Sequence, residues 1–286
     1  MHQTSYQLFE PAQLQSCVVF ASPHSGRGYS AAFKRQTNLG ELALRSSEDA
    51  FVDHLFGEVV TFGAPLLTAV APRAYVDLNR AAEELDPALI EGAPPSRQNP
   101  RIASGLGVIP RVVSNGRAIY SGKLTLAEAR QRVDTIWHPY HAKLQNVLNR
   151  ATLQFGQSVL IDCHSMPHEA VKSTTLAGSR TPEIVLGDRF GASAAPAIVA
   201  AVEAAFKDQG FRVARNAPFA GAYIAQNYGR PSRQQHVIQV EIDRSLYMDE
   251  TAVKPLPGYT DFRQRLSKAL RVIAALEQTP QHLAAE

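Results

Sequence analysis

The chain has 286 residues, of which 45% are hydrophobic and 19% charged, so it can form a sizeable core and disorder is not indicated. The net charge of +3 is spread along the sequence without a run of Lys and Arg, which excludes nucleic acid as the expected partner. No apolar run reaches the roughly 18 residues that span a bilayer, and the N-terminus lacks a secretory pattern. We therefore expect a cytoplasmic protein with no membrane partner.

Apolar runs that alternate with helical periodicity predict a single α/β domain over residues 1–286. In chain order, we expect strands at Cys17–Ala21, Leu66–Val70, Tyr75–Leu78, Ser158–Cys163, Glu183–Leu186, Phe211–Ala214 and Val237–Ile242. The expected helices are Glu48–Val60, Thr125–Leu153 with an interruption at Pro139, Ala192–Gln209 and Asp261–Glu277. The cysteines, Cys17 and Cys163, both lie in apolar runs, and we expect them to be reduced, although a disulfide between them is an alternative.

Residues 82–118 interrupt this pattern. The segment is rich in Pro and Gly and has few apolar runs. Because long structureless loops are uncommon in compact domains and are often functional, we expect a lid or a rim around a site.

Polar and ionisable residues lie at the ends of several predicted strands. They are His24 after the first strand, Asp77, Asn79 and Arg80 at the end of the third, Asp162 and His164 at the end of the strand that begins at Ser158, and Glu241, Asp243 and Arg244 at the end of the last. In open α/β sheets, ligands bind where the carboxyl ends of strands converge, so this grouping predicts a functional site.

A metal site is one interpretation of His24 and His164. Imidazole nitrogen suits zinc, and a catalytic zinc takes three protein ligands with one open position. A carboxylate would complete the set, with Asp49 as the candidate and Glu48 as its rival. The alternative is that each histidine is a hydrogen-bonded loop residue. The HExxH motif is absent, so distant segments would have to assemble the site.

Glu241 interrupts an otherwise apolar strand, and a buried carboxylate is either paired or used. Next to a metal, it could act as general base toward water and as proton donor to a leaving amine. A salt bridge to Arg244 or to a neighbouring residue is the structural alternative, and Asp243, two residues further along the chain, could share or take over the role of base.

Asn79 and Arg80 suggest a carboxylate-binding pair, because the guanidinium fork matches a carboxylate with two parallel hydrogen bonds. A surface arginine at a loop start is the alternative. Four further arginines fall near predicted strand ends or site loops: Arg73, Arg189, Arg230 and Arg244. A dianionic substrate would use at least two of them. The GxSxG, P-loop and GxGxxG patterns are absent, which argues against serine-hydrolase and nucleotide chemistry.

Several segments in one order resemble the N-formylglutamate amidohydrolase family. They are SPHSGRGY at Ser22–Tyr29, SEDAFVDHLF at Ser47–Phe56, PRAYVDLNR at Pro72–Arg80, IYSGKLTLAEAR at Ile119–Arg130, HPYHAKL at His138–Leu144, LIDCHSMP at Leu160–Pro167, LGDRFG at Leu186–Gly191 and QVEIDRSLYMDE at Gln239–Glu250.

The resemblance implies a fold related to the zinc carboxypeptidases and aspartoacylases, with a mixed, largely parallel sheet and helices on both faces. It implies hydrolysis of a small N-acyl acidic amino acid, N-formyl-L-glutamate above all, as the last step of a histidine-degradation route. One divalent metal ion is implied, zinc first and cobalt or manganese as alternatives.

By motif, His24 and His164 would bind the metal with a carboxylate of the SEDAFVD segment. Glu241 would be the general base, and Asn79 with Arg80 would hold the substrate α-carboxylate. Position 27 is arginine, where the carboxypeptidase pattern has a glutamate, so the choice between Asp49 and Glu48 stays open.

Two other functions remain as alternatives. One is the same chemistry on another substrate, as in a carboxypeptidase or a cell-wall amidase. The other is a metal-free binding protein that has kept the fold. The sequence leaves the oligomeric state undetermined.

Overall fold

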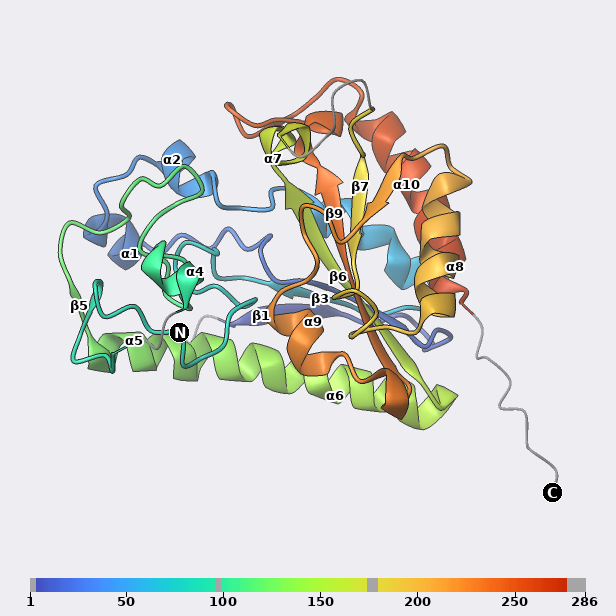
Figure 1. The fold of residues 1–286 in the computed structure, drawn as a ribbon, viewed down its shortest axis with the longest axis horizontal. Helices are drawn as coiled ribbons and strands as arrows, with labels where there is room; N and C mark the ends of the chain where they lie inside the picture. The colour runs from blue at the N-terminus through green and yellow to red at the C-terminus, as the bar shows by residue number, and fades with distance from the viewer. Residues whose placement is uncertain (1–3, 96–98, 174–179, 277–286) are drawn as a thin grey trace.

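The computed structural model describes residues 4–95, 99–173 and 180–276. A seven-stranded sheet in the order β1-β3-β2-β6-β9-β7-β8 forms its centre (Figure 1). The strands are β1 Tyr6–Phe9, β2 Val18–Ser22, β3 Leu66–Ala69, β6 Ser158–Met166, β7 Ile184–Gly187, β8 Val213–Arg215 and β9 Gln235–Asp243. The sheet is mixed, since β1 is antiparallel to β3 and β7 is antiparallel to β9.

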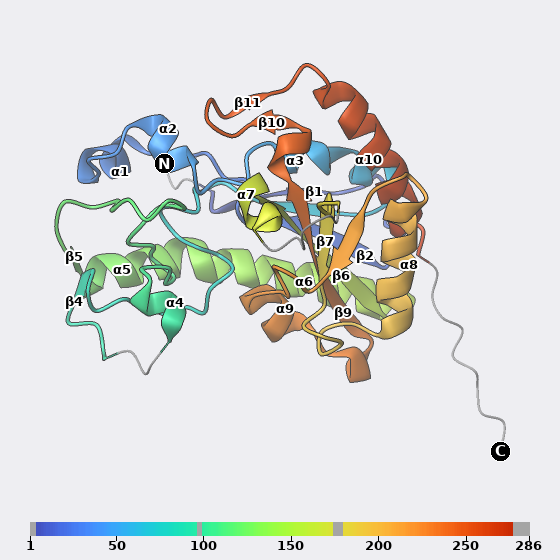
Figure 2. The same ribbon diagram turned by 45° about the horizontal axis from the view of Figure 1, so that its top comes forward.

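Helices cover both faces of the sheet, as Figures 1 and 2 show. The longest are α6 His138–Phe155, α8 Pro196–Lys207 and α10 Tyr259–Ala274. Side chains of β2 alternate between the two sides. Val19 packs in the cluster that contains residues of α6, whereas Val18 packs in the cluster that contains residues of α8 and α10. The near-continuous burial of the central strands follows from this two-sided cover.

The shorter elements surround this core. They are α1 Ala31–Gln36, α2 Glu41–Arg45, α3 Val52–Leu55, α4 Pro100–Ala103, α5 Leu126–Arg132, α7 His168–Lys172, α9 Tyr223–Tyr228, β4 Ile90–Glu91, β5 Leu124–Thr125, β10 Met248–Asp249 and β11 Lys254–Pro255. No helix in the described ranges is long and apolar enough to cross a membrane. Cys17 and Cys163 are buried and not joined.

The topology determines where a ligand can approach. Strands β3, β2, β6 and β9 run parallel, so their carboxyl ends lie at one edge of the sheet. From β2 the sheet extends to β3 on one side and to β6 on the other. The ends of β2 and β6 therefore flank a topological switch point, where open α/β sheets bind their ligands.

The structure confirms the predicted α/β fold and six of the seven predicted strands, and it corrects the seventh. Residues Tyr75–Leu78 are not a strand of the sheet but part of a turn that begins at Pro72, whose carbonyl accepts from the N–H groups of Tyr75 and Val76. Val76 and Leu78 are nevertheless buried, which explains the strand-like alternation in the sequence.

The predicted helix Glu48–Val60 is also wrong in extent. The structure has α3 over only Val52–Leu55, followed by a 3₁₀ helix at Gly57–Phe62. Phe51 has a φ of 68°, a left-handed conformation that an α-helix cannot contain. Glu48 and Asp49 therefore lie in a turn before α3 and not in a first helical turn.

The predicted long helix Thr125–Leu153 consists of α5 and α6 joined by a π-helical turn at Val133–Trp137. The turn ends just before Pro139, the residue at which we predicted an interruption. The last two predicted helices are α8 and α10; Glu277, the predicted end of the latter, lies outside the described residues.

In the described parts of segment 82–118, only β4 and α4 are regular strand or α-helix, and residues 96–98 lie outside the description.

Candidate active site

A cavity of about 450 Å³ opens at the carboxyl ends of β2, β6 and β9. Its lining includes eight residues that the sequence predicts for a site: His24, Asp49, Arg73, Asn79, Arg80, His164, Glu241 and Arg244. Two of the predicted arginines, Arg189 and Arg230, are not among the lining residues. The backbone N–H of Arg189 donates to the carbonyl of Ala220.

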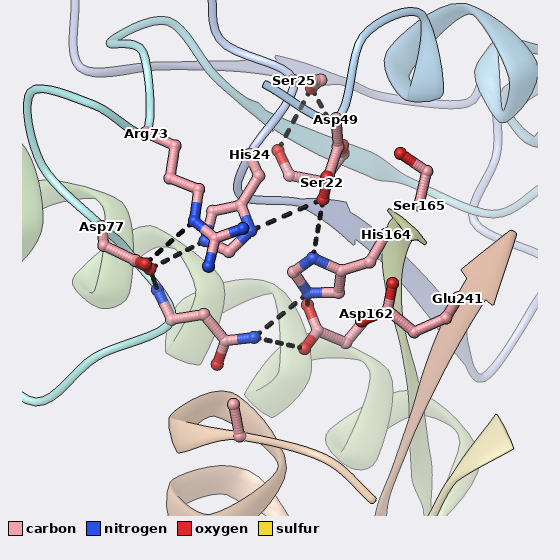
Figure 3. A network of polar contacts seen from close by, with 12 residues as sticks. Ser22, His24, Ser25, Asp49, Arg73, Asp77, Asp162, His164, Ser165 and Glu241 are labelled. Atoms are coloured by element: carbon pink, nitrogen blue, oxygen red, sulfur yellow. Dashed lines mark hydrogen bonds and ion pairs between the residues drawn. The ribbon is translucent and has the colours of Figure 1, made fainter. Parts of the chain in front are cut away.

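Two histidines and one carboxylate meet at the floor of this cavity (Figure 3). The Oδ2 atom of Asp49 lies 3.0 Å from Nδ1 of His164 and 3.5 Å from Nδ1 of His24. The N–H of Asp49 donates to the carbonyl of His24, which fixes the two segments against each other. All three side chains are buried.

This arrangement fits a metal ion. One ligand atom from each of His24, Asp49 and His164 lies within 4.8 Å of the others. Zinc bonds of about 2.0–2.2 Å in tetrahedral geometry place ligand atoms about 3.3–3.6 Å apart, close to the observed separations. In addition, Nδ1 of His24 is buried without a hydrogen-bond partner among the described residues. A buried nitrogen lone pair of this kind is available as a metal ligand.

Each histidine has a second carboxylate on its other ring nitrogen. Nε2 of His24 lies 2.8 Å from Asp77, and Nε2 of His164 lies 3.0 Å from Asp162. At His24, the hydrogen bond between Nε2 and Asp77 sets the tautomer that leaves Nδ1 free for a metal. Burial opposes ionisation of Asp77, but His24 and Arg73 hold its pKa well below the usual range.

Asp49 and its neighbour Glu48 have different surroundings. Glu48 bonds Arg45 at 3.0 and 3.1 Å and Tyr29 at 3.1 Å, away from the histidines. The other oxygen of Asp49, Oδ1, accepts a hydrogen bond from Nη2 of Arg244 at 2.9 Å. Burial opposes ionisation of the Asp49 carboxyl, but the neighbouring imidazoles of His164 and His24 hold its pKa well below the ordinary value. The geometry therefore favours Asp49 over Glu48 as the third ligand.

Glu241 lies beside His164 on the neighbouring strand, in register with it across β6 and β9. Its Oε1 accepts from Nε2 of Gln239 at 2.7 Å, and it forms no salt bridge with Arg244 within the described residues. Burial raises the pKa of Glu241 to about 7, with Asp49 adding to the rise and His164 opposing it. A carboxyl with a pKa near neutrality suits proton transfer, and a nearby cation would lower that pKa.

Asp243, the alternative base, does not reach the cavity. Its Oδ2 lies 2.8 Å from Nδ1 of His168, and Oδ1 accepts from the Ser245 side chain at 2.8 Å.

The amide of Asn79 is held on both ends. Nδ2 faces Asp162 at 3.2 Å and Nε2 of His164 at 3.1 Å, while Oδ1 accepts from the N–H of Ile224 at 2.8 Å. The backbone before and after Asn79 is held by the end of the π-helical turn and the start of α6. Nε2 of His141 lies 2.9 Å from the carbonyl of Leu78, and the Trp137 indole donates to the carbonyl of Arg80 at 2.9 Å. Asn79 therefore has a rigid position next to the histidine cluster.

The arginines of the cavity differ in how many of their guanidinium nitrogens form hydrogen bonds with described residues. Arg244 uses Nε, Nη1 and Nη2 on Ser165, Ser46 and Asp49. Among the described residues, Arg73 donates only through Nε, to Asp77 at 3.0 Å. Arg80 donates Nε and Nη1 to backbone carbonyls and has no carboxylate in ion-pair range within the described residues. Arg101 also lines the cavity.

Sequence reasoning missed Gln239 and Arg101. The sequence could have indicated Gln239, because residues 239, 241 and 243 are spaced by two and so lie on the same face of β9. Nothing in the local sequence separates Arg101 from the other arginines of segment 82–118.

Gly26 keeps the loop that carries His24 against the loop after β3. A Cβ atom on Gly26 would overlap the carbonyl oxygen of Ala71 and lie 2.9 Å from the carbonyl carbon of Val70. We expect Gly26→Ala to lower the free energy of unfolding by about 1–3 kcal/mol, as overpacking does, and to weaken metal binding because His24 must move. Thermal unfolding and metal titration measure both. Gly122→Ala, which meets nothing within 4 Å, is the control and should change neither. An unchanged Gly26→Ala variant would contradict this account.

Comparisons with known proteins show the family of this chain. The family model described as N-formylglutamate amidohydrolase matches residues 16–248. An N-formylglutamate deformylase of Pseudomonas aeruginosa is 30% identical over 243 residues, which cover 82% of this chain and 83% of that protein. The N-formylglutamate deformylase of Pseudomonas putida is 29% identical over 241 residues, 82% of either chain.

Solved structures support the same relationship. The crystal structure of an N-formylglutamate amidohydrolase from Ralstonia eutropha JMP134 superposes with a TM-score of 0.87 at 34% identity, covering 95% of this chain and 98% of that one. A gene product of Agrobacterium tumefaciens has a TM-score of 0.60 at 18% identity, covering 95% and 97%, and shares the fold.

Proposed function

The chain belongs to the N-formylglutamate amidohydrolase family, and we propose that it hydrolyses N-formyl-L-glutamate to formate and L-glutamate. The observation that carries the proposal is the cluster of His24, Asp49 and His164 beside Glu241, in a cavity that arginines also line. The cluster suits activation of an amide and a water molecule, and the arginines suit a substrate with carboxylates. Glutamate and formate as products would place the enzyme at the end of histidine degradation.

We propose that His24, Asp49 and His164 hold one divalent metal ion, with zinc as the first candidate because two imidazoles and a carboxylate match its ligand preference. When bound, such an ion polarises the amide carbonyl and lowers the pKa of water. Asp77 and Asp162 orient the two imidazoles, and Arg244 holds the second oxygen of Asp49. Arg244 therefore acts on the metal site and not on the substrate.

Glu241 is the proposed general base. It accepts a proton as water attacks the formyl carbon, which forms the C–O bond of formate. The same proton passes to the glutamate nitrogen as the C–N bond breaks, so Glu241 is regenerated. Gln239 holds one oxygen of the Glu241 carboxylate in place at 2.7 Å.

Arg80 and Arg73 are the proposed site for the α-carboxylate, which is attached to the carbon next to the scissile nitrogen. Arg73 lies beside His24 (Figure 3). Each guanidinium keeps Nη donors that form no hydrogen bond with a described residue. They are both Nη atoms of Arg73 and Nη2 of Arg80. The fixed amide of Asn79 keeps this turn next to the cluster.

Turnover of four substrates tests the proposal. Purified protein loaded with zinc is assayed on N-formylglutamate, N-formylaspartate, N-acetylglutamate and a dipeptide, with and without chelator. We expect the highest kcat/KM on N-formylglutamate and loss of that activity with chelator. Preference for the dipeptide would support the carboxypeptidase alternative. Absence of both turnover and stoichiometric metal would overturn the proposal in favour of a binding protein.

A further inference from the structure

Arg101 has a guanidinium that faces the cavity without an acidic partner. The residue is exposed, it lines the cavity, and no described carboxylate lies within ion-pair distance of it. Its backbone, by contrast, is fixed. The Arg101 N–H donates to the side chain of Asn99 at 3.0 Å, the next residue Ile102 is buried, and Arg111 donates to the carbonyl of Ala103. The side chain thus extends from an anchored helical turn.

Arg80 and Arg101 are linked through the backbone of one residue, Leu106. Nε of Arg80 donates to the carbonyl of Leu106 at 3.0 Å, and the N–H of Leu106 donates to the carbonyl of Arg101 at 2.8 Å. Starting from Asn79 at the histidine cluster, this chain of contacts runs through Arg80 and Leu106 to Arg101. Arg101 is therefore the cavity arginine at the end of this chain, and no described contact joins it to the cluster.

The like charges of Arg80 and Arg101 in one cavity favour binding of an anion. Arg80 is buried and has no ion-pair partner within the described residues, and an uncompensated buried charge is costly. Burial lowers the pKa of the Arg80 guanidinium, and the nearby charges of Arg73 and Arg101 lower it further, although Asp77 opposes them. The carboxylates of the cavity are already engaged, since Asp49 faces the histidines and Arg244 while Glu241 bonds Gln239.

We propose that Arg101 binds the side-chain carboxylate of the substrate and so selects a dicarboxylate. The inference rests on the proposed function, since a scissile amide at the histidine cluster places the α-carboxylate near Arg73 and Arg80. The side-chain carboxylate is then the anion more distant from the cluster, and Arg101 is the lining arginine that contacts within the described residues connect to the cluster only through Leu106 and Arg80.

The kinetic test compares N-formylglutamate with its neutral isostere N-formylglutamine. We expect Arg101→Ala to raise KM for N-formylglutamate about 10- to 100-fold, the loss expected for a charge-assisted hydrogen bond, with a smaller change in kcat. Turnover of N-formylglutamine should stay at the wild-type value. Arg101→Lys should recover part of the loss, because the charge remains without the planar fork.

Arg130→Ala is the matched control, since Arg130 is exposed and does not line the cavity. This substitution also removes one positive charge, and it should change the KM and kcat of neither substrate. An equal loss on both substrates in Arg101→Ala, or no change on either, would overturn the proposal.

Equilibrium binding separates this inference from the proposed function. Calorimetry measures binding of L-glutamate and L-glutamine to the zinc-loaded wild type and to Arg101→Ala. We expect the wild type to prefer glutamate and the variant to lose that preference about 10- to 100-fold. A preference that persists in the variant overturns the role of Arg101, whatever the enzyme hydrolyses. Failure of the wild type to hydrolyse N-formylglutamate, with the glutamate preference still dependent on Arg101, overturns only the proposed function.

Discussion

Glu241→Gln is expected to lower kcat for N-formylglutamate about 10²- to 10⁴-fold, the contribution of a positioned general base. The substitution keeps the shape of the side chain and an oxygen for the Gln239 hydrogen bond, but it removes the group that accepts the proton. Because the buried side chain loses a charge, the variant should fold at least as stably as the wild type. Steady-state kinetics, metal content and thermal unfolding measure the three quantities.

Asp243→Asn is the matched control for this variant. Asp243 lies two residues further along β9 but pairs with His168 outside the cavity. We expect it to keep near-normal kcat. Near-normal turnover in Glu241→Gln, or a comparable loss in both variants, would contradict the assignment of Glu241 as the base.

Asp49→Asn is expected to weaken zinc binding by more than about 100-fold, the upper range for losing a residue that merely supports a ligand. The substitution removes the anionic oxygen that faces both histidines and leaves Arg244 without its carboxylate. Breaking a buried pair costs about 3–5 kcal/mol, so a drop in the free energy of unfolding should accompany the loss. Zinc titration by calorimetry and chemical unfolding measure the two effects.

Glu48→Gln tests the neighbouring carboxylate directly. Glu48 is buried too, but its partners are Arg45 and Tyr29. We expect this variant to bind zinc as the wild type does, under conditions where circular dichroism shows that both variants are folded. Zinc retained by Asp49→Asn and lost by Glu48→Gln would reverse the assignment.

Local sequence patterns predicted most of the fold because the spacing of apolar residues indicates which side chains of a segment are buried. The apolar run of β6 and its flanking turn signals are present in the sequence whatever packs on them. The same pattern misled at Tyr75–Leu78, where alternating burial arises in a turn that packs on the core and not in a strand. The helix predicted from Glu48 failed because the left-handed Phe51 breaks the chain direction, which periodicity does not record.

The sequence by itself determined most of the elements of this protein, the two histidines near strand ends and the buried Glu241, because each depends on residues close along the chain. The tertiary structure alone decided which carboxylate faces the histidines, that Arg244 forms an ion pair with Asp49, and that Arg101 lines the cavity with Arg80. The physical reason is that adjacent residues such as Glu48 and Asp49 have the same local pattern but opposite surroundings. Which one reaches the histidines depends on contacts between segments far apart in sequence, such as the bond from the Asp49 N–H to the carbonyl of His24.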